Sequence, residues 1–130
     1  MTARISLKLK KVVKMTSYEK MIHILHNKDI ELLEDWVADD YFFIFESQMR
    51  TRDEFLERMK DFFSRSGNAS DFMFEEKCLY ENEDCMNYTR LERQEDGEMY
   101  RVVGMVLKNS DGKIWRSIER ITKVEVKKYE

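Results

Sequence analysis

The sequence predicts an α+β domain, with three helices in the N-terminal half and long β-strands in the C-terminal half. Two stretches of the N-terminal half begin with a capping box, in which a Thr is followed three residues later by a Glu, and continue with apolar residues at helical spacing. From Asp71 onward polar and apolar residues alternate, and Asp-Gly pairs interrupt the alternation. This order is typical of helices that cover one face of an antiparallel sheet.

The first capping box is Thr16-Ser17-Tyr18-Glu19, where the Thr oxygen and the Glu carboxylate each accept a hydrogen bond from an otherwise free backbone amide. The helix that follows has an apolar face made of Tyr18, Met21, Ile22 and Leu25. A short second helix begins after its N-cap, Asp29, and its apolar residues are Ile30, Leu33, Trp36 and Val37.

The second capping box, Thr51-Arg52-Asp53-Glu54, predicts the third helix. The apolar face of this helix consists of Phe55, Leu56, Met59, Phe62 and Phe63. Between the second and third helices the apolar run YFFIF, residues 41–45, predicts a buried strand because aromatic and β-branched residues favour strands.

Three turns divide the remaining chain into four strands. They lie around Asn82-Glu83, at Asp96-Gly97 and at Asp111-Gly112. An Asp-Gly pair favours a two-residue hairpin turn, because both turn residues must adopt positive φ. We therefore predict a four-stranded antiparallel meander.

The hairpin turns also determine which residues share a face of the sheet. With two-residue turns, Gly104 lies opposite Thr89 on one side and Glu119 on the other. One face then carries only two charged residues, Glu76 and Glu119, whereas the other carries seven. We expect the helices to cover the first face, so that both carboxylates point inward. A turn one residue longer or shorter would place Glu119 on the outer face instead.

The inner face forms the candidate site, because Gly104 leaves room beside Glu119 and an apolar pocket with a few polar groups is the usual ligand site. We predict Glu119 and Glu76 as catalytic residues. The predicted ligand-binding residues are Asn87, Thr89, Ser117, Trp115, Tyr18, Trp36 and His26. Two carboxylates in such a pocket hinder each other's ionisation, and burial acts in the same direction, which suits one of them to acid/base chemistry. In the alternative interpretation Glu119 is structural and pairs with a basic residue.

The charge of the chain argues against a nucleic-acid partner. The formal charge is −3, and residues 1–14 contribute +5, so the rest of the chain carries −8. We interpret residues 1–14 as a basic extension and residues 15–130 as a single domain. No apolar run reaches the length of a membrane span or resembles a signal peptide, and we expect a cytoplasmic protein that makes no contact with membranes. Cys78 and Cys85 lack zinc-site spacing, and the spacing of His23 and His26 is a weak metal signal, so we predict no metal.

The segment NKDIELLEDWVADDYFFI, residues 27–44, resembles the nuclear-transport-factor-2-like superfamily in its SnoaL-like branch. The likeness extends over residues 16–126 and includes the capped helix TRDEFLERMKDFF. It implies a cone-shaped fold with three N-terminal helices packed on a curved antiparallel sheet, and chemistry without a cofactor. The residues that correspond to the catalytic tyrosine and aspartate of the related ketosteroid isomerases are Met21 and Phe45, neither of which moves protons.

Three functional classes remain open at this point. The first is an acid/base isomerase, cyclase or dehydratase that acts on a small apolar substrate. The second is a protein that binds such a ligand without chemistry, and the third is a dimeric interaction domain whose cone is filled by side chains. We also expect a homodimer through the outer sheet face, whose predicted apolar residues are Met73, Met86, Tyr88, Val103, Met105, Leu107 and Ile118.

Overall fold

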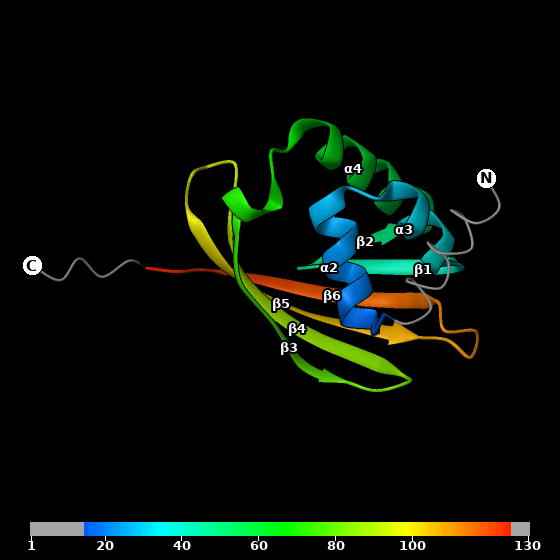
Figure 1. Cartoon of the computed structure of the whole chain (residues 1–130). Coiled ribbons are helices and arrows are strands. Elements are labelled where there is room, and N and C mark those ends of the chain that lie inside the picture. The colour runs from blue at the N-terminus through cyan, green and yellow to red at the C-terminus, as the bar shows by residue number, and fades with distance from the viewer. Residues whose placement is uncertain (1–14, 126–130) are drawn as a thin grey trace, which may run out of the picture.

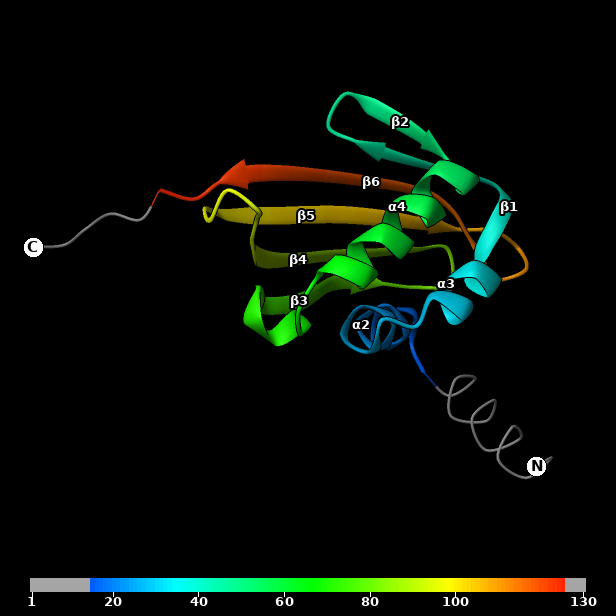
Figure 2. The ribbon, with the colours of Figure 1, turned by 90° about the horizontal axis from the view of Figure 1, so that it is seen from above.

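The computed structural model describes residues 15–125 and confirms the α+β class. Three helices, α2 (Ser17–Asn27), α3 (Ile30–Trp36) and α4 (Arg52–Arg65), lie on one side of a single sheet that curves beneath them (Figure 1). Seen from above, α4 crosses over the strands, whereas α2 lies beside the edge of the sheet that ends in β3 (Figure 2). The predicted extension, residues 1–14, lies outside the described residues. Within the described residues no helix is both long and apolar enough to cross a bilayer.

The sheet is mixed, so the prediction of a purely antiparallel sheet is wrong at one place. Its six strands lie in the order β2-β1-β6-β5-β4-β3, and β1 runs parallel to β6. The strands are β1 (Val37–Phe45), β2 (Gln48–Thr51), β3 (Met73–Glu81), β4 (Cys85–Arg93), β5 (Met99–Lys108) and β6 (Ile114–Lys123). Strands β3 to β6 form the predicted meander. The short strand β2 was not predicted, because its four residues QMRT carry no apolar alternation.

Both capping boxes are present and begin their helices where the sequence predicted. The hydroxyl of Thr16 accepts a hydrogen bond from the amide of Glu19, and the hydroxyl of Thr51 accepts one from the amide of Glu54. Thr51 is also the last residue of β2, so this single residue joins a strand directly to α4. As a result, the side chains of β2 and α4 are held close to one another.

The hydrophobic core fills the space between the concave face of the sheet and the three helices. Its most buried members from the helices are Ile24, Leu33, Trp36, Leu56 and Phe63. From the sheet they are Val37, Tyr41, Phe43, Met86, Tyr88, Val102, Val106 and Ile114. The indole nitrogen of Trp36 donates a hydrogen bond to the carbonyl of Gly112, at 3.1 Å, and so ties α3 to the β5–β6 turn.

The predicted register is right between β5 and β6 and wrong between β4 and β5. Gly104 pairs with Glu119 as expected, but it pairs with Tyr88 instead of Thr89. The cause is the turn at Asp96-Gly97, where Gln94 and Glu98 bond across a loop of three residues instead of two. One extra turn residue reverses the faces of a strand. The inward residues of β4 are therefore Met86, Tyr88, Arg90 and Glu92, and the outward residues are Asn87, Thr89 and Leu91.

The β5–β6 turn also has three residues, but a bulge at Trp115 restores the predicted register beyond it. Lys108 pairs with Ile114 next to the turn, whereas Leu107 pairs with Arg116, so Trp115 is the extra residue. Ile114 takes the inward position next to the turn, and Trp115 stacks against the guanidinium of Arg116 at 4.1 Å. The inward direction of Glu119 thus depends on a turn and a bulge that compensate for each other.

The junction at Thr51 gives a first test of the fold. We expect Thr51→Ala to lower the free energy of unfolding by about 1 kcal/mol, because the first amides of α4 lose their cap. Thr51→Ser retains the hydroxyl and is the matched control, which should stay close to the parent protein. Urea denaturation of the three proteins measures the difference, and equal stability of the Ala and Ser variants would contradict the capping role.

Candidate functional site

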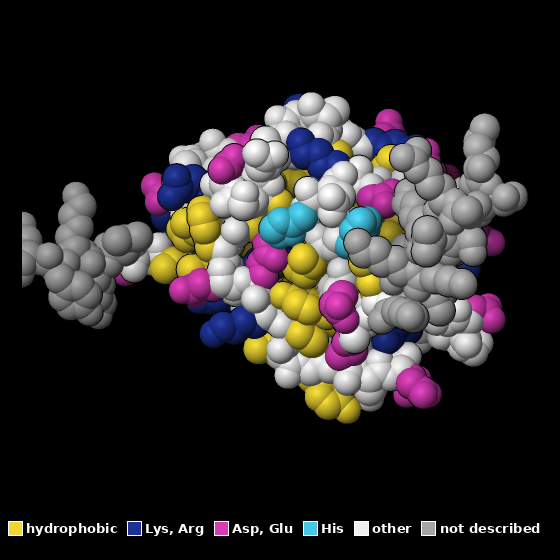
Figure 3. Space-filling view, viewed as in Figure 1, with side chains coloured by type: hydrophobic (Ala, Val, Ile, Leu, Met, Phe, Trp, Pro, Cys, Tyr) yellow, Lys and Arg dark blue, Asp and Glu magenta, His cyan; other side chains and the backbone are white. Residues whose placement is uncertain are grey.

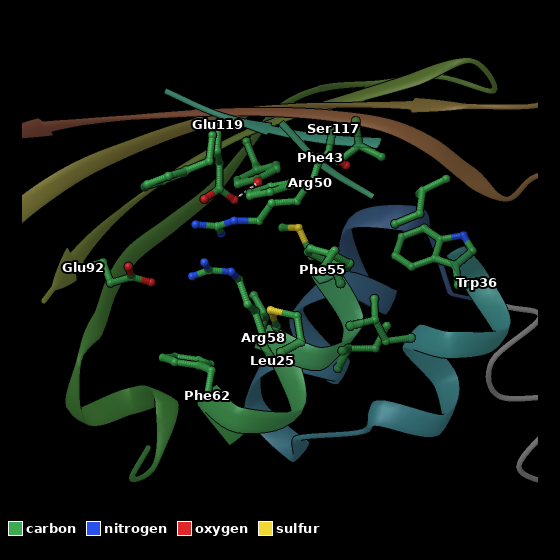
Figure 4. Close-up of a pocket in the computed structure, with 18 of the residues that line it drawn as sticks. Leu25, Trp36, Phe43, Arg50, Phe55, Arg58, Phe62, Glu92, Ser117 and Glu119 are labelled. Carbon is green, nitrogen blue, oxygen red and sulfur yellow. Dashed lines mark hydrogen bonds between the residues drawn. The ribbon is translucent and has the colours of Figure 1, made fainter. Parts of the chain in front are cut away.

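A cavity of about 390 Å³ lies between the concave face of the sheet and the helices. Its walls are mainly apolar and come from α2, α3 and α4 and from the inner face of the sheet, chiefly β1, β2, β4 and β6 (Figure 4). Its apolar lining includes Met21, Leu25, Trp36, Phe43, Phe45, Phe55, Met59 and Phe62. A concave apolar site of this size accommodates a small molecule.

A chain of polar side chains crosses the sheet wall of this cavity. The hydroxyl of Tyr88 donates a short hydrogen bond to Oε2 of Glu119, and Arg90 Nη2 lies 3.8 Å from the same oxygen. On its other side, Arg90 Nε donates to Oε1 of Glu92 at 3.3 Å. Gln94 donates to Oε2 of Glu92. The guanidinium of Arg90 therefore lies between two carboxylates that face one cavity.

Burial shifts the pKa values of several polar side chains along this wall of the cavity. Arg90 is only 7% exposed, and although burial acts to lower its pKa, its acidic neighbours, Glu119 first among them, outweigh burial and hold that pKa above the ordinary value. For Glu92, burial raises the pKa above the usual glutamate range; Arg90 opposes this shift, and Glu119 adds to it. Burial also raises the pKa of Tyr88 and of Tyr41, so both phenols stay protonated.

Gly104 provides the space that this arrangement needs. A Cβ atom at residue 104 would lie 2.2 Å from Cζ and 2.3 Å from the hydroxyl oxygen of Tyr88. Non-bonded contacts of a Cβ atom are essentially never this short, so the Tyr88 ring occupies the space that a side chain at residue 104 would need. The ring lies across Gly104 and reaches Glu119 on the next strand, which is the room beside Glu119 that the sequence indicated.

Of the predicted site residues, Glu119, Ser117 and Trp36 line the cavity. Glu76 does not, and the predicted pairing of Glu76 with Glu119 in one pocket is wrong. Its carboxylate binds Nε2 of His26 at 2.8 and 3.0 Å, on the outside of α2. The two histidine side chains are visible at the surface of the molecule, among acidic and apolar neighbours (Figure 3). His26 and Glu76 thus connect α2 to β3 instead of facing the cavity.

Four further predicted residues lie away from the cavity. Asn87 and Thr89 belong to the outward side of β4, because of the three-residue turn described above. Trp115 is displaced by the bulge, and Tyr18 packs against the core from the start of α2, where its amide donates to Glu81. None of the four lines the cavity.

The residues that sequence analysis missed are Tyr88, Arg90 and Glu92. They alternate along β4 at positions i, i+2 and i+4, which is the spacing of one face of a strand. The predicted register, which assumed two-residue turns, placed these residues on the face that carries seven charges, and that face was taken as the outer one. The signal that could have placed them inside is the pairing of an arginine and a glutamate at i and i+2 next to an inward Glu119, which is the composition of a buried ion-pair chain.

We expect Gly104→Ala to destabilise the protein by about 1–3 kcal/mol, the usual cost of adding a methyl group to a packed interior. The added methyl displaces the Tyr88 ring and breaks its hydrogen bond to Glu119. Leu79→Ala, at an exposed residue of β3, is the control and should change stability by less than about 0.5 kcal/mol. Chemical denaturation measures both, and an unchanged Gly104→Ala variant would show that Tyr88 does not need this space.

No protein-family model matches the chain. The curated proteins contain no match either. Solved structures do match it in fold. An LEH-like epoxide hydrolase of M. tuberculosis is 16% identical over 80% of this chain and 78% of its own, with a TM-score of 0.58. An NTF-2-like protein of unknown function from Burkholderia xenovorans is 13% identical over 80% of this chain and 78% of its own, with a TM-score of 0.57.

A third structure, an NTF2-like protein of unknown function from Cytophaga hutchinsonii, is 12% identical over 85% of this chain and 93% of its own, with a TM-score of 0.54. Likeness at such low identity concerns the backbone architecture and carries no activity with it. The SnoaL-like branch named from the sequence is not singled out by these matches and stays a prediction. The chain has the nuclear-transport-factor-2-like fold, as its sequence resemblance implied.

Proposed function

We propose that this protein is an acid/base enzyme that acts on a small, largely apolar molecule inside the cavity. The observation that carries the proposal is the pair of carboxylates, Glu92 and Glu119, that face one apolar cavity on either side of Arg90. Two carboxyl groups in different environments are the usual means of supplying an acid and a base at the same pH. This pair replaces the predicted pair of Glu119 and Glu76.

Glu92 is the proton donor in this proposal. Its raised pKa favours the neutral carboxyl group at a pH where an ordinary glutamate is ionised. The side-chain amide of Gln94 contacts Oε2 of Glu92 and can turn its own oxygen toward a protonated carboxyl. Glu92 therefore has a partner in either protonation state.

Glu119 is the proton acceptor. Tyr88 and Arg90 both contact its Oε2 atom, and among residues 15–125 no donor is bonded to Oε1. That oxygen is free to accept a proton from water or from a substrate carbon. Tyr88 holds the carboxylate in place through its hydrogen bond, and Arg90 places a positive charge beside it.

The first reaction to test is the opening of an epoxide by water. The oxygen of water attacks a ring carbon and breaks the C–O bond, Glu119 takes the proton from water, and Glu92 gives its proton to the released oxygen, so that a diol forms. The structural similarity to an epoxide hydrolase supports this choice of assay. Isomerisation, cyclisation or dehydration of a small apolar substrate would use the same two groups.

The same cavity would also serve a protein that binds an apolar ligand without chemistry. A ligand carrier needs no buried carboxylates, since burying them costs free energy. The Glu92–Arg90–Glu119 chain is the feature that favours an enzyme over this second class, and activity measurements separate the two.

We expect Glu119→Gln and Glu92→Gln each to lower kcat about 10²–10⁴-fold on styrene oxide or cyclohexene oxide, the usual worth of one acid or base. In the parent protein kcat/KM should remain high at pH values above the pKa of an ordinary glutamate. It should then fall as the pH rises through the raised pKa of Glu92, because Glu92 loses the proton that it donates. Glu92→Gln should abolish this alkaline decline. Glu75→Gln, on the exposed face of β3, is the matched control and should keep parental activity.

Diol formation followed over a range of pH measures these effects. Parental rates in both glutamine variants would refute the assignment of acid and base. Binding of cyclic ethers without any turnover of epoxides, or of ketones that can enolise, would favour the carrier instead.

The oligomeric state is part of the proposal as well. We propose a homodimer through the outer sheet face, but with a smaller patch than the sequence indicated, because Met73, Met86 and Tyr88 are buried inside. The exposed apolar residues of that face are Val103, Met105 and Ile118, and Met105 pairs directly with Ile118. Both cysteines are free thiols, which fits the cytoplasmic location proposed from the sequence.

Sedimentation at micromolar concentration tests the dimer. The parent protein should sediment as a dimer, and Val103→Lys should sediment as a monomer because a charge in the centre of the patch is buried without a partner. Leu79→Lys changes a residue of β3 that is more exposed than Val103; it is the control and should leave the dimer intact. A monomeric parent protein would exclude this interface.

A further inference from the structure

Arginines 50 and 58 form a second group of charges in the cavity. Arg50 pairs with Phe43 across β1 and β2, so both side chains lie on the cavity side of the sheet. Arg58 lies on the stripe of α4 that contains Phe55, Met59 and Phe62, all of which line the cavity. Figure 4 shows both guanidinium groups reaching into the cavity from opposite walls, toward the side where Glu92 and Glu119 lie.

These two arginines differ from the other arginines of the cavity in their partners. Arg90 lies between Glu92 and Glu119, and Arg65 binds Asp61 at 2.9 Å and Glu95 at 2.6 Å. Within residues 15–125, neither Arg50 nor Arg58 lies within 4.0 Å of a carboxylate. The one polar side-chain partner of Arg50 in this part of the chain is Gln48, at 3.4 Å.

Glu54, the acidic residue near the two arginines, already accepts hydrogen bonds from Thr51. Glu54 bonds to the amide and the hydroxyl of Thr51, at 3.2 and 3.0 Å, as part of the capping box. Burial and the neighbouring charge of Arg58 both lower the pKa of Arg50, which indicates that the two guanidinium groups repel each other. The charge of Glu54 opposes this shift in part, but within residues 15–125 no carboxylate lies within ion-pair distance of either guanidinium, so an anion bound between the two arginines would relieve their repulsion.

We propose that the ligand of this cavity carries a carboxylate, which Arg50 and Arg58 bind together. The proposal rests on the function proposed above in one respect, since it names the substrate class of the same cavity: a small apolar acid. A guanidinium group binds a carboxylate through two parallel hydrogen bonds. Each of the two opposite walls of the cavity provides one guanidinium group, Arg50 on one wall and Arg58 on the other. The apolar part of the acid lies against Phe43, Phe55 and Phe62.

A carboxylate fits this cavity better than a phosphate does. Glu119 faces the same space, and its negative charge repels a dianion more strongly than a monoanion. The two arginines together balance one carboxylate and leave a net positive charge that holds it. Binding also fixes the acid at one end, so that the rest of the molecule extends toward the two catalytic carboxylates.

Calorimetric binding of octanoate, with octanol as a neutral probe of the same length, tests the proposal without any catalytic activity. We expect octanoate to bind the parent protein at least tenfold more tightly than octanol. Arg50→Gln and Arg58→Gln should each weaken octanoate about tenfold or more, which corresponds to about 1.4 kcal/mol, and leave octanol unchanged. Arg101→Gln, an arginine of the outer sheet face, removes the same charge and should have no effect.

Equal binding of octanoate and octanol, or parental octanoate binding by both cavity variants, would overturn the proposal. Tighter binding of octyl phosphate than of octanoate would overturn the choice of carboxylate. Glu119→Gln separates this proposal from the enzymatic one, because it removes the base and should retain or strengthen octanoate binding. If octanoate binds through both arginines while no substrate turns over, the anion site stands and the acid/base function fails. If neutral epoxides are hydrolysed but octanoate binding does not depend on the arginines, the acid/base function stands and the anion site fails.

Discussion

The buried charge of Arg90 is the constraint on which the rest of this structure depends. A guanidinium that is 7% exposed must have counter-charges, because an unpaired charge in such a place costs several kcal/mol. Glu119 supplies the negative charge from β6, two strands away, and Glu92 on the same strand accepts a hydrogen bond from the guanidinium. The pairing of β4 with β5 and of β5 with β6 must therefore keep the observed register, because a shift in either would separate Arg90 from Glu119. Gly104, between them, must lack a side chain so that Tyr88 reaches Glu119.

The cavity combines two kinds of electrostatic environment. On the sheet side the positive charge of Arg90 is surrounded by acids, and the burial that this requires raises the pKa of Glu92. On the side of β2 and α4 the positive charges of Arg50 and Arg58 have no counter-charge within ion-pair distance among the described residues. The first group is internally balanced and suited to moving protons, whereas the second is unbalanced and suited to holding a ligand. Their separation across one cavity gives a bound molecule a direction.

Local signals in the sequence predicted the helices and the meander well, because capping boxes and Asp-Gly turns are encoded within a few residues. Thr16, Asp29 and Thr51 all act as caps where expected. The pairing of β1 with β6 was not predictable in this way, since it joins residues about 75 positions apart. The site was predicted in part. Glu119 was placed inward correctly, but Arg90 and Glu92 were assigned to the outside, because turn length cannot be read from the residues Asp96 and Gly97 alone.

The two three-residue turns have unequal consequences for how this chain can change in evolution or in design. After the β5–β6 turn, the bulge at Trp115 absorbs the extra residue, and the sheet continues as if the turn were shorter. The β4–β5 turn has no such compensation, and its length alone decides that Arg90 and Glu92 face inward. A single deletion between Gln94 and Glu98 would exchange the part of the cavity lining that β4 contributes for Asn87, Thr89 and Leu91, although the sequence of the strand would be unchanged. Only insertions of an even number of residues would keep the inward face of β4, so the length of this short loop controls the composition of the cavity wall as directly as the residues of the strand do.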